Sequence, residues 1–174
     1  MKTSRKRRKQ NKTDYLKRIK LLKSSRPRVV FRKTNKYILA QYIISKEAKD
    51  SVKIGINSKI LLKYGWPKEK IGGLKSIPAS YLTGYLMGKR ILKGKLDEPI
   101  VDFGMIRTVY KTRVFAFLKG LIDSGIKIQC KEEAFPEEER IMKKDIKINE
   151  IKTKIDKDEP FRKDSKTIEK VPKK

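Results

Sequence analysis

The amino-acid sequence predicts an α/β (α+β) domain, a mixed β-sheet flanked by helices, with a basic arm before it and a charged tail after it. Three observations predict this class. Segments of two-residue apolar period precede a long helical pattern, a further strand-to-helix unit follows, and 37% apolar residues in a chain of 174 allow one modest core. We expect four parts: an arm and helix at 1–25, the α/β domain at 26–128, a helical extension at 129–148 and the charged tail at 149–174.

Residues 2–12, KTSRKRRKQNK, contain seven cations, no acid and no apolar residue. Such a segment cannot gain enough by burial to order itself, so we expect it to be disordered in the free protein and to order on a phosphate backbone. A localisation signal or a solubilising segment is the alternative. After it, Thr13 is expected to cap a helix from Asp14 to about Lys23, whose apolar stripe would pack against the domain.

The segment RVVFRKTNKYILAQYII at 28–44 predicts a β-hairpin, because β-branched and aromatic residues alternate in two runs around a polar turn. In that turn Asn35 most readily accepts a positive φ. Three cations and an aromatic ring would meet at the tip: Arg32, Lys33, Lys36 and Tyr37. Such a group could bind phosphates and stack a base, although a solvated tip with ordinary surface lysines explains the pattern about as well.

A third strand is predicted at 50–56, where Val52, Ile54 and Ile56 would share a face. A short helical turn should follow, and we interpret Trp66 after it as a core anchor and not as a base-stacking residue.

The strongest helical pattern runs from Ser76 to Gly94, with a proline in its first turn. Small residues recur every four positions, at Ser80, Gly84 and Gly88. We therefore expect that side of the helix to approach the sheet closely.

A fourth strand at 99–104 and a helix from Arg113 to Asp123 enclose the loop MIRTVYKTR, and together they predict an α/β unit. Loops of such units commonly carry binding groups, and this one presents Arg107, Lys111 and Arg113.

Beyond that unit, Pro136 is expected to begin a further helix with acids in its first turn. From Asn149 onward the chain alternates Lys with Asp and Glu and shows no continuous apolar stripe. This pattern predicts a tail that is mobile or ordered only on a partner.

The charge indicates the class of partner, since 47 Lys and Arg oppose 20 Asp and Glu and give a formal net charge of +27. Self-repulsion of this size favours a polyanion, and nucleic acid is preferred to a membrane because no run of 18 apolar residues occurs. The chain has no histidine and one cysteine, Cys130, so it lacks the usual general base and any internal disulfide. We expect no enzyme, no metal, no cofactor and no small-molecule substrate.

Asp102 is the carboxylate that could indicate a metal-dependent nuclease, because it lies within a predicted strand. Two-metal chemistry requires several converging acids. The acids before residue 95 are few and none occupies a matching strand position: Asp14, Glu47, Asp50 and Glu69. Magnesium-dependent cleavage that disappears with Asp102→Asn would support this rival. A generic basic protein that binds any RNA or DNA is the second rival.

Four segments together resemble one family. They are RRKQNKTDYLKRIKLLKSSRPRVVFRKTNKYILAQ at 7–41, KYGW at 63–66, PASYLTGYLMGKR at 78–90 and VDFGMIRTVYKTRVFAFLKGLIDSGI at 101–126. The family is that of large-subunit ribosomal protein eighteen in its archaeal form, which binds 5S ribosomal RNA and whose eukaryotic equivalent is large-subunit protein five. The resemblance covers residues 5 to about 148 in the right order.

The resemblance implies a structural constituent of the large subunit of the cytoplasmic ribosome, with a ribonuclease H-like topology. It would anchor 5S rRNA to the large, 23S-type rRNA in the central protuberance, beside the other 5S rRNA-binding protein and neighbouring large-subunit proteins. Matched by position, the RNA contacts would be Arg5, Lys6, Arg7, Arg8, Lys9, Tyr15, Arg18, Arg28, Arg32, Lys33, Asn35, Lys36, Tyr37, Arg107, Lys111 and Arg113. The sequence departs from the family at Lys111, where members usually have glycine.

Overall fold

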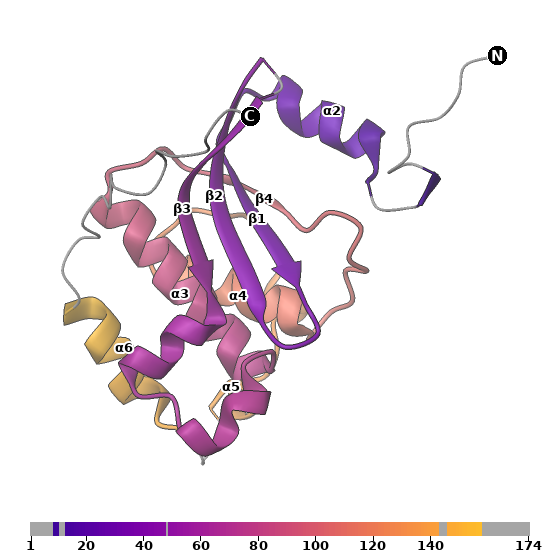
Figure 1. Ribbon diagram of the computed structural model, residues 1–174. Coiled ribbons are helices and arrows are strands. Elements are labelled where there is room, and N and C mark those ends of the chain that lie inside the picture. Colours follow the sequence, from indigo (N-terminus) through magenta and orange to yellow (C-terminus); the bar gives the residue numbers. More distant parts are fainter. Residues whose placement is uncertain (1–8, 11–12, 48, 143–145, 158–174) are drawn as a thin grey trace, which may run out of the picture.

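A four-stranded mixed sheet forms the centre of the protein in a computed structural model that describes residues 9–10, 13–47, 49–142 and 146–157 (Figure 1). The strands are β1 (Arg28–Lys33), β2 (Ile38–Lys46), β3 (Lys49–Asn57) and β4 (Ile100–Asp102). Their order is β3-β2-β1-β4, with β2 antiparallel to both neighbours and β4 parallel to β1. The predicted α/β class and hairpin are confirmed, while the ribonuclease H-like topology stays a prediction.

An irregularity in β3 changes the face on which one residue lies. Tyr42 pairs with Ile54 but the next residue, Ile43, pairs with Val52, so β3 contains one extra residue at Lys53. A bulge of this kind reverses the alternation of side chains beyond it. Ile56 is accordingly buried, whereas Val52 is 48% exposed. The prediction that Val52 shares a face with the core residues of this strand is wrong.

Two helices, α3 (Ile77–Lys93) and α4 (Arg113–Asp123), cover one face of the sheet (Figure 1). Alternate residues of β1, such as Val29 and Phe31, point to this face and are fully buried. The rings of Phe31 and Phe117 lie 4.9 Å apart between their centroids, which joins the sheet to α4. Both helices have the predicted bounds, because the apolar stripe of each helix and the residues at its ends indicate the same start and end.

The small residues of α3 pack against α4 and not against the sheet, which corrects the prediction. A Cβ atom at Gly84 would collide with the backbone carbonyl of Phe117, and one at Gly120 with that of Tyr81. Ser80 donates a hydrogen bond to the carbonyl oxygen of Arg113 at 2.6 Å. The two helix backbones therefore touch along a strip that only small residues allow.

Helix α2 (Tyr15–Lys23) forms as predicted, but its N-cap is Asp14, whose side chain accepts a hydrogen bond from the backbone of Lys17 at 3.1 Å. The prediction that Thr13 caps it is wrong by one residue. No residue of α2 is fully buried, and Leu16 and Ile19 are 69% and 51% exposed. Tyr15 and Leu22 of the expected apolar stripe are half-buried, so packing through this stripe is confirmed only in part.

Two 3-10 helices, η1 (Ser58–Tyr64) and η2 (Lys68–Gly73), connect β3 to α3. Trp66 lies between them, is 2% exposed, and donates its indole N–H to the carbonyl of Lys70 at 3.0 Å. Its predicted role as a core anchor is confirmed. Leu92, near the end of α3, is 46% exposed.

The chain after α4 passes through η3 (Glu132–Ala134) and the short helix α5 (Glu138–Ile141), and then forms α6 (Ile148–Lys157). Ile148, Ile151 and Ile155 of α6 are all buried, at the spacing of one helix face. The phenol of Tyr85 on α3 donates to Asp156 at 3.0 Å. The prediction that the chain after Asn149 lacks an apolar stripe is wrong for α6, and residues 158–174 lie outside the described part.

Candidate nucleic-acid interface

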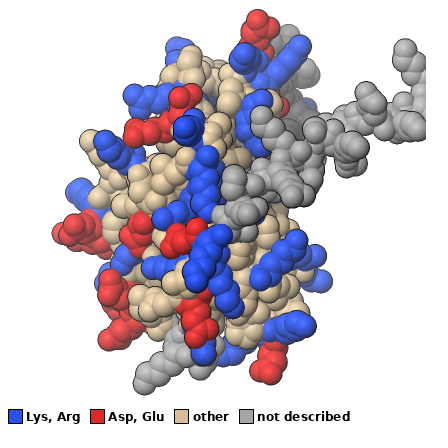
Figure 2. Space-filling view, turned by 90° about the vertical axis from the view of Figure 1, so that its left-hand side faces the viewer, with Lys and Arg blue, Asp and Glu red and all other residues tan. Residues whose placement is uncertain are grey.

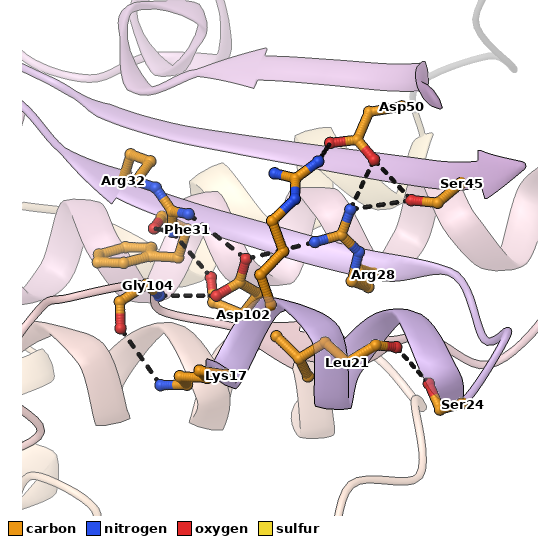
Figure 3. A network of polar contacts seen from close by, with 11 residues as sticks. Lys17, Leu21, Ser24, Arg28, Phe31, Arg32, Ser45, Asp50, Asp102 and Gly104 are labelled. Carbon is orange, nitrogen blue, oxygen red and sulfur yellow. Dashed lines mark hydrogen bonds and ion pairs between the residues drawn. The ribbon is translucent and has the colours of Figure 1, made fainter. Parts of the chain in front are cut away.

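Arg28 lies at the centre of a polar network on the sheet face opposite α3 and α4 (Figure 3). Its guanidinium is 2.8 Å from the Asp50 carboxylate, 2.9 Å from the Ser45 hydroxyl and 3.7 Å from the Asp102 carboxylate. The side chain is 3% exposed. Although Arg28 is one of the RNA contacts expected from the sequence, its charge is used inside the protein, where an external phosphate does not reach it.

Arg32 also points into this network and not toward the hairpin tip (Figure 3). Its guanidinium is 3.4 Å from the Asp102 carboxylate and donates to the carbonyl oxygens of Phe31 and Asp102 at 2.8 and 3.1 Å. Unlike Arg28, its side chain is 43% exposed. The expected meeting of Arg32 with the two tip lysines is therefore wrong, although one side of the guanidinium is open to a ligand.

The network holds helix α2 on the sheet. Arg18 pairs with Asp50 at 2.8 Å, and the Lys17 ammonium donates to the carbonyl of Gly104 at 3.2 Å. Partial burial acts to raise the pKa of Asp50, but hydrogen bonds from Ser45 and Arg18 and the charges of the two arginines outweigh it and hold that pKa below its ordinary value. Arg18 is thus partly committed to the fold, and Tyr15 is half-buried on the same helix.

The hairpin tip presents Lys33, Asn35 and Lys36, which are all exposed. The turn is fixed by Thr34, whose hydroxyl accepts from the backbone N–H of Tyr37 at 2.9 Å. Asn35 does not adopt the expected positive φ, because the Thr34 side chain closes the turn without it. The tip is a pair of lysines and one amide on a rigid strand end.

The ring of Tyr37 at the base of this tip is already in contact with a cation. Lys59 lies over it with its ammonium 4.6 Å from the ring centroid. Because Tyr37 is half-buried, at most one face and one edge of its ring remain available to stack on a base. Lys59 itself adds a cation to the tip. The sequence did not predict this contact, because Lys59 lies outside the hairpin segment.

The loop between β4 and α4 carries the other group of expected contacts. Arg107 and Lys111 are exposed and Arg113 is half-buried. With Lys33 of β1 and Arg140 of α5 they surround a cavity of about 540 Å³. We call this hollow the β4–α4 cavity. Arg140 was missed by sequence reasoning because its acidic neighbours suggested only a solvated helix.

Lys111 adopts the left-handed conformation, with φ of +57°. This conformation favours glycine, which agrees with the glycine expected at this position in the resembling family. The Lys111 backbone N–H donates to the carbonyl of Ala134 at 2.9 Å, and its ammonium pairs with Glu137 at 2.8 Å. These two contacts hold the loop with a lysine in place.

The basic arm is largely outside the described part of the chain, which excludes Arg5, Lys6, Arg7 and Arg8, whereas Lys9 is described and exposed. The side of the protein that carries α6 has a different character. Figure 2 shows Lys and Arg interspersed there with Asp and Glu. Lys89 pairs with Asp156 at 3.1 Å and Lys147 with Glu150 at 2.9 Å. This balanced side is less suited to a polyanion than the hairpin tip and the β4–α4 loop.

Asp102 is held between Arg28 and Arg32, and its carboxylate also accepts the backbone N–H of Gly104 at 2.7 Å. Within residues 9–10, 13–47, 49–142 and 146–157, no group of three His, Cys, Asp or Glu side chains is placed to hold a metal ion. Cys130 is only partly buried, and burial raises the pKa of its thiol. None of these groups forms a catalytic arrangement.

Residues 1–99 match the family described as "Ribosomal large subunit proteins 60S L5, and 50S L18". The chain belongs to this family of ribosomal large-subunit proteins. It is 47% identical to the large ribosomal subunit protein uL18 of Korarchaeum cryptofilum over 135 residues, which cover 78% of this chain and 67% of that protein. It is 36% identical to the uL18 protein of Methanothermobacter thermautotrophicus over 163 residues, 94% of this chain and 82% of that protein.

Membership of the family confirms the prediction that the chain is a ribosomal protein of the large subunit. The chain is a structural protein of the large subunit of the cytoplasmic ribosome, which is a ribonucleoprotein, and it is not an enzyme. In the part of the chain that the structure describes, none of the helices combines the length and apolar character needed to cross a membrane.

Proposed function

We propose that this ribosomal protein binds 5S rRNA and anchors it to the large rRNA of the subunit. The proposed contacts are the basic arm, the hairpin tip and the β4–α4 loop. The observation that carries the proposal is the gathering of Lys33, Arg107 and Arg113 from separate segments around one hollow whose lining contains no carboxylate. Like charges held together in this way favour a phosphate backbone as partner.

The proposal keeps most of the contacts expected from the sequence but gives three of them roles within the fold. Arg28 acts inside the fold, and Arg18 and Arg32 divide their hydrogen bonds between the fold and any ligand. Among the members of the set that the structure describes, the exposed ones are Lys9, Lys33, Asn35, Lys36, Arg107 and Lys111. The position in the central protuberance, beside the other 5S rRNA-binding protein, is part of the same proposal and rests on the family resemblance.

A filter-binding titration of 5S rRNA over a series of salt concentrations tests the proposal. The variant Lys33→Ala/Lys36→Ala removes two cations from the hairpin tip. The matched control Lys154→Ala/Lys157→Ala removes two exposed cations from α6. Each neutralised phosphate contact contributes about 0.7 to 0.9 to the logarithmic salt slope.

The tip variant should reduce the salt slope by about 1.4 to 1.8 and lower the preference for 5S rRNA over an unrelated RNA duplex. The α6 variant should leave that preference unchanged. Equal losses from both variants, with no preference for 5S rRNA in the unaltered chain, would instead identify a generic basic nucleic-acid-binding protein.

A further inference from the structure

We propose that the β4–α4 cavity holds a single unstacked nucleotide of the bound RNA, with its phosphate among the cations at the rim and its base against the apolar wall. This inference rests on the proposed binding of RNA and adds to it a particular subsite. A groove that only follows a phosphate backbone would need neither the depth nor the apolar wall that this cavity has.

The position of the cavity follows from the fold. It lies where the carboxyl ends of the parallel strands β1 and β4 meet the first residues of α3 and α4. In α/β sheets this end of a parallel pair is where ligands bind. The volume of about 540 Å³ falls within the range of about 300 to 1,000 Å³ in which small ligands are bound.

The wall of the cavity is apolar and the rim is cationic. Ile106 and Val109 provide branched apolar surface at the cavity, where Val109 is 47% exposed, whereas Phe31 and Val114, which also line it, are 0% and 4% exposed. An unstacked base needs apolar or aromatic surface of this kind to replace its stacking neighbours. The apolar wall therefore suits a nucleotide base and not an inorganic anion, which has no such group.

Most cations of the rim have no ion-pair partner among the described residues. Of the five, only Lys111 has an ion pair with a described residue, to Glu137. Among residues 9–10, 13–47, 49–142 and 146–157, no ion pair to Lys33, Arg107, Arg113 or Arg140 is formed. A phosphate between them would remove the repulsion, which is the chemistry that an RNA backbone supplies.

Ser76 is the second indication that a ligand is missing from this cavity. Ser76 lines the cavity, and its hydroxyl oxygen is buried and has no hydrogen-bond partner in the described part of the protein. As N-cap of the 17-residue helix α3 it would ordinarily accept a backbone N–H, but it makes no such bond. Thr112 at the start of α4 makes none either. The starts of both helices line the cavity, and backbone N–H groups of a first helical turn favour an anion there.

The test uses methyl NMR of the full chain with four separate probes: uridine 5′-monophosphate, adenosine 5′-monophosphate, uridine and inorganic phosphate. The monophosphates should shift the methyl signals of Ile106, Val109 and Val114. Uridine alone and phosphate alone should bind at least 10-fold more weakly, because each lacks half of the contacts. Equal effects from phosphate and the monophosphates would show an anion site without a base pocket and would overturn the proposal.

Two variants separate the cavity from general charge. Ser76→Asp places a carboxylate at the buried hydroxyl while keeping a good N-cap, so the helix should form and the monophosphates should bind at least 10-fold more weakly. Thr153→Asp, with the same change of charge on an exposed position of α6, should have no effect. Val109→Trp should fill the opening without changing charge, and Val52→Trp, at a similarly exposed valine, is its control.

The same four variants are then measured with 5S rRNA. If Ser76→Asp and Val109→Trp weaken 5S rRNA binding at least 5-fold relative to their controls, the cavity holds part of that RNA. If both bind 5S rRNA like the unaltered chain, the cavity proposal is overturned while the proposed function stands. If the unaltered chain shows no preference for 5S rRNA, the proposed function fails, and the mononucleotide titration still reports on the cavity.

Discussion

Replacing Arg28 by methionine should destabilise the fold much more than it weakens RNA binding. The Arg28 side chain is 3% exposed, and its guanidinium lies between the carboxylates of Asp50 and Asp102. Removing one partner of a buried ion pair typically costs about 3 to 5 kcal/mol, because the other charge stays buried without compensation. The methionine side chain keeps most of the apolar contacts, so the loss should come from the charges.

The structure places the expected cost of Arg28→Met near the lower end of that range. Asp102 would still have Arg32 at 3.4 Å, and Asp50, whose side chain is 27% exposed, would still have Arg18 at 2.8 Å. The buried Nε of Arg28 already lacks a hydrogen-bond partner among the described residues, so the native network is not fully satisfied. We therefore expect a loss of about 3 kcal/mol in the free energy of unfolding.

Urea denaturation followed by circular dichroism measures this loss, and Arg26→Met provides the control because Arg26 is exposed two residues earlier. The control should change the free energy of unfolding by less than about 0.5 kcal/mol. A loss below about 1 kcal/mol for Arg28→Met, together with a loss of 5S rRNA affinity at full stability, would refute the reasoning. Arg28 would then be an RNA contact, as its position in the sequence suggested.

Four further outcomes follow from other parts of the fold. Gly84→Ala should cost about 1 to 3 kcal/mol or more by pushing α3 from α4, whereas Gly72→Ala, with open space around its Cβ, should be neutral in the same thermal denaturation experiment. Ile151→Ala should cost about 2 to 5 kcal/mol if α6 is part of the core, and an unchanged melting temperature would contradict its burial. Lys111→Gly should leave the stability unchanged or raise it by up to about 1 kcal/mol, because glycine removes the strain of the left-handed backbone and the ion pair that is lost is exposed. A marked loss of stability would contradict this. The pKa of Asp50 is lowered in the folded protein, so its ion pairs stabilise the fold at neutral pH and are lost as the pH falls below about 4. The variant Asp50→Asn should therefore be less stable than the unaltered protein at pH 7 and equally stable at about pH 2.

The sequence allowed the sheet and the two long helices to be predicted because each is determined by a local pattern. The alternation around Phe31 and the stop at Gly94 are readable within one segment, and both agree with the structure. The bulge at Lys53 is a local exception that alternation alone does not indicate.

Helix α6 was missed because its apolar stripe is thin. Ile148, Ile151 and Ile155 stand among charged residues, and the segment reads as polar until α3 and η1 provide a surface that covers the isoleucines. Helix α2 shows the opposite error. Its stripe includes Leu16, which suggested packing, but the helix is held by the Arg18–Asp50 ion pair and a hydrogen bond from Lys17, and the leucine stays exposed.

The candidate interface could be predicted only as a set of basic segments. Which arginines face outward depends on carboxylates far away in the sequence, and Arg28 is withdrawn from the surface by Asp50 and Asp102 from two other strands. Arg140 joins the β4–α4 cavity for the same long-range reason. Such pairings between charged residues far apart in the chain cannot be recognised from a single sequence.

The most direct test of the proposed function is a density map of the large ribosomal subunit that contains this chain. The hairpin tip and the β4–α4 loop should lie within hydrogen-bonding distance of 5S rRNA phosphates, with Lys33 and Arg107 among the contacting residues. The α6 side should face solvent or protein. A map in which these two segments face solvent while α6 contacts the 5S rRNA would contradict the account.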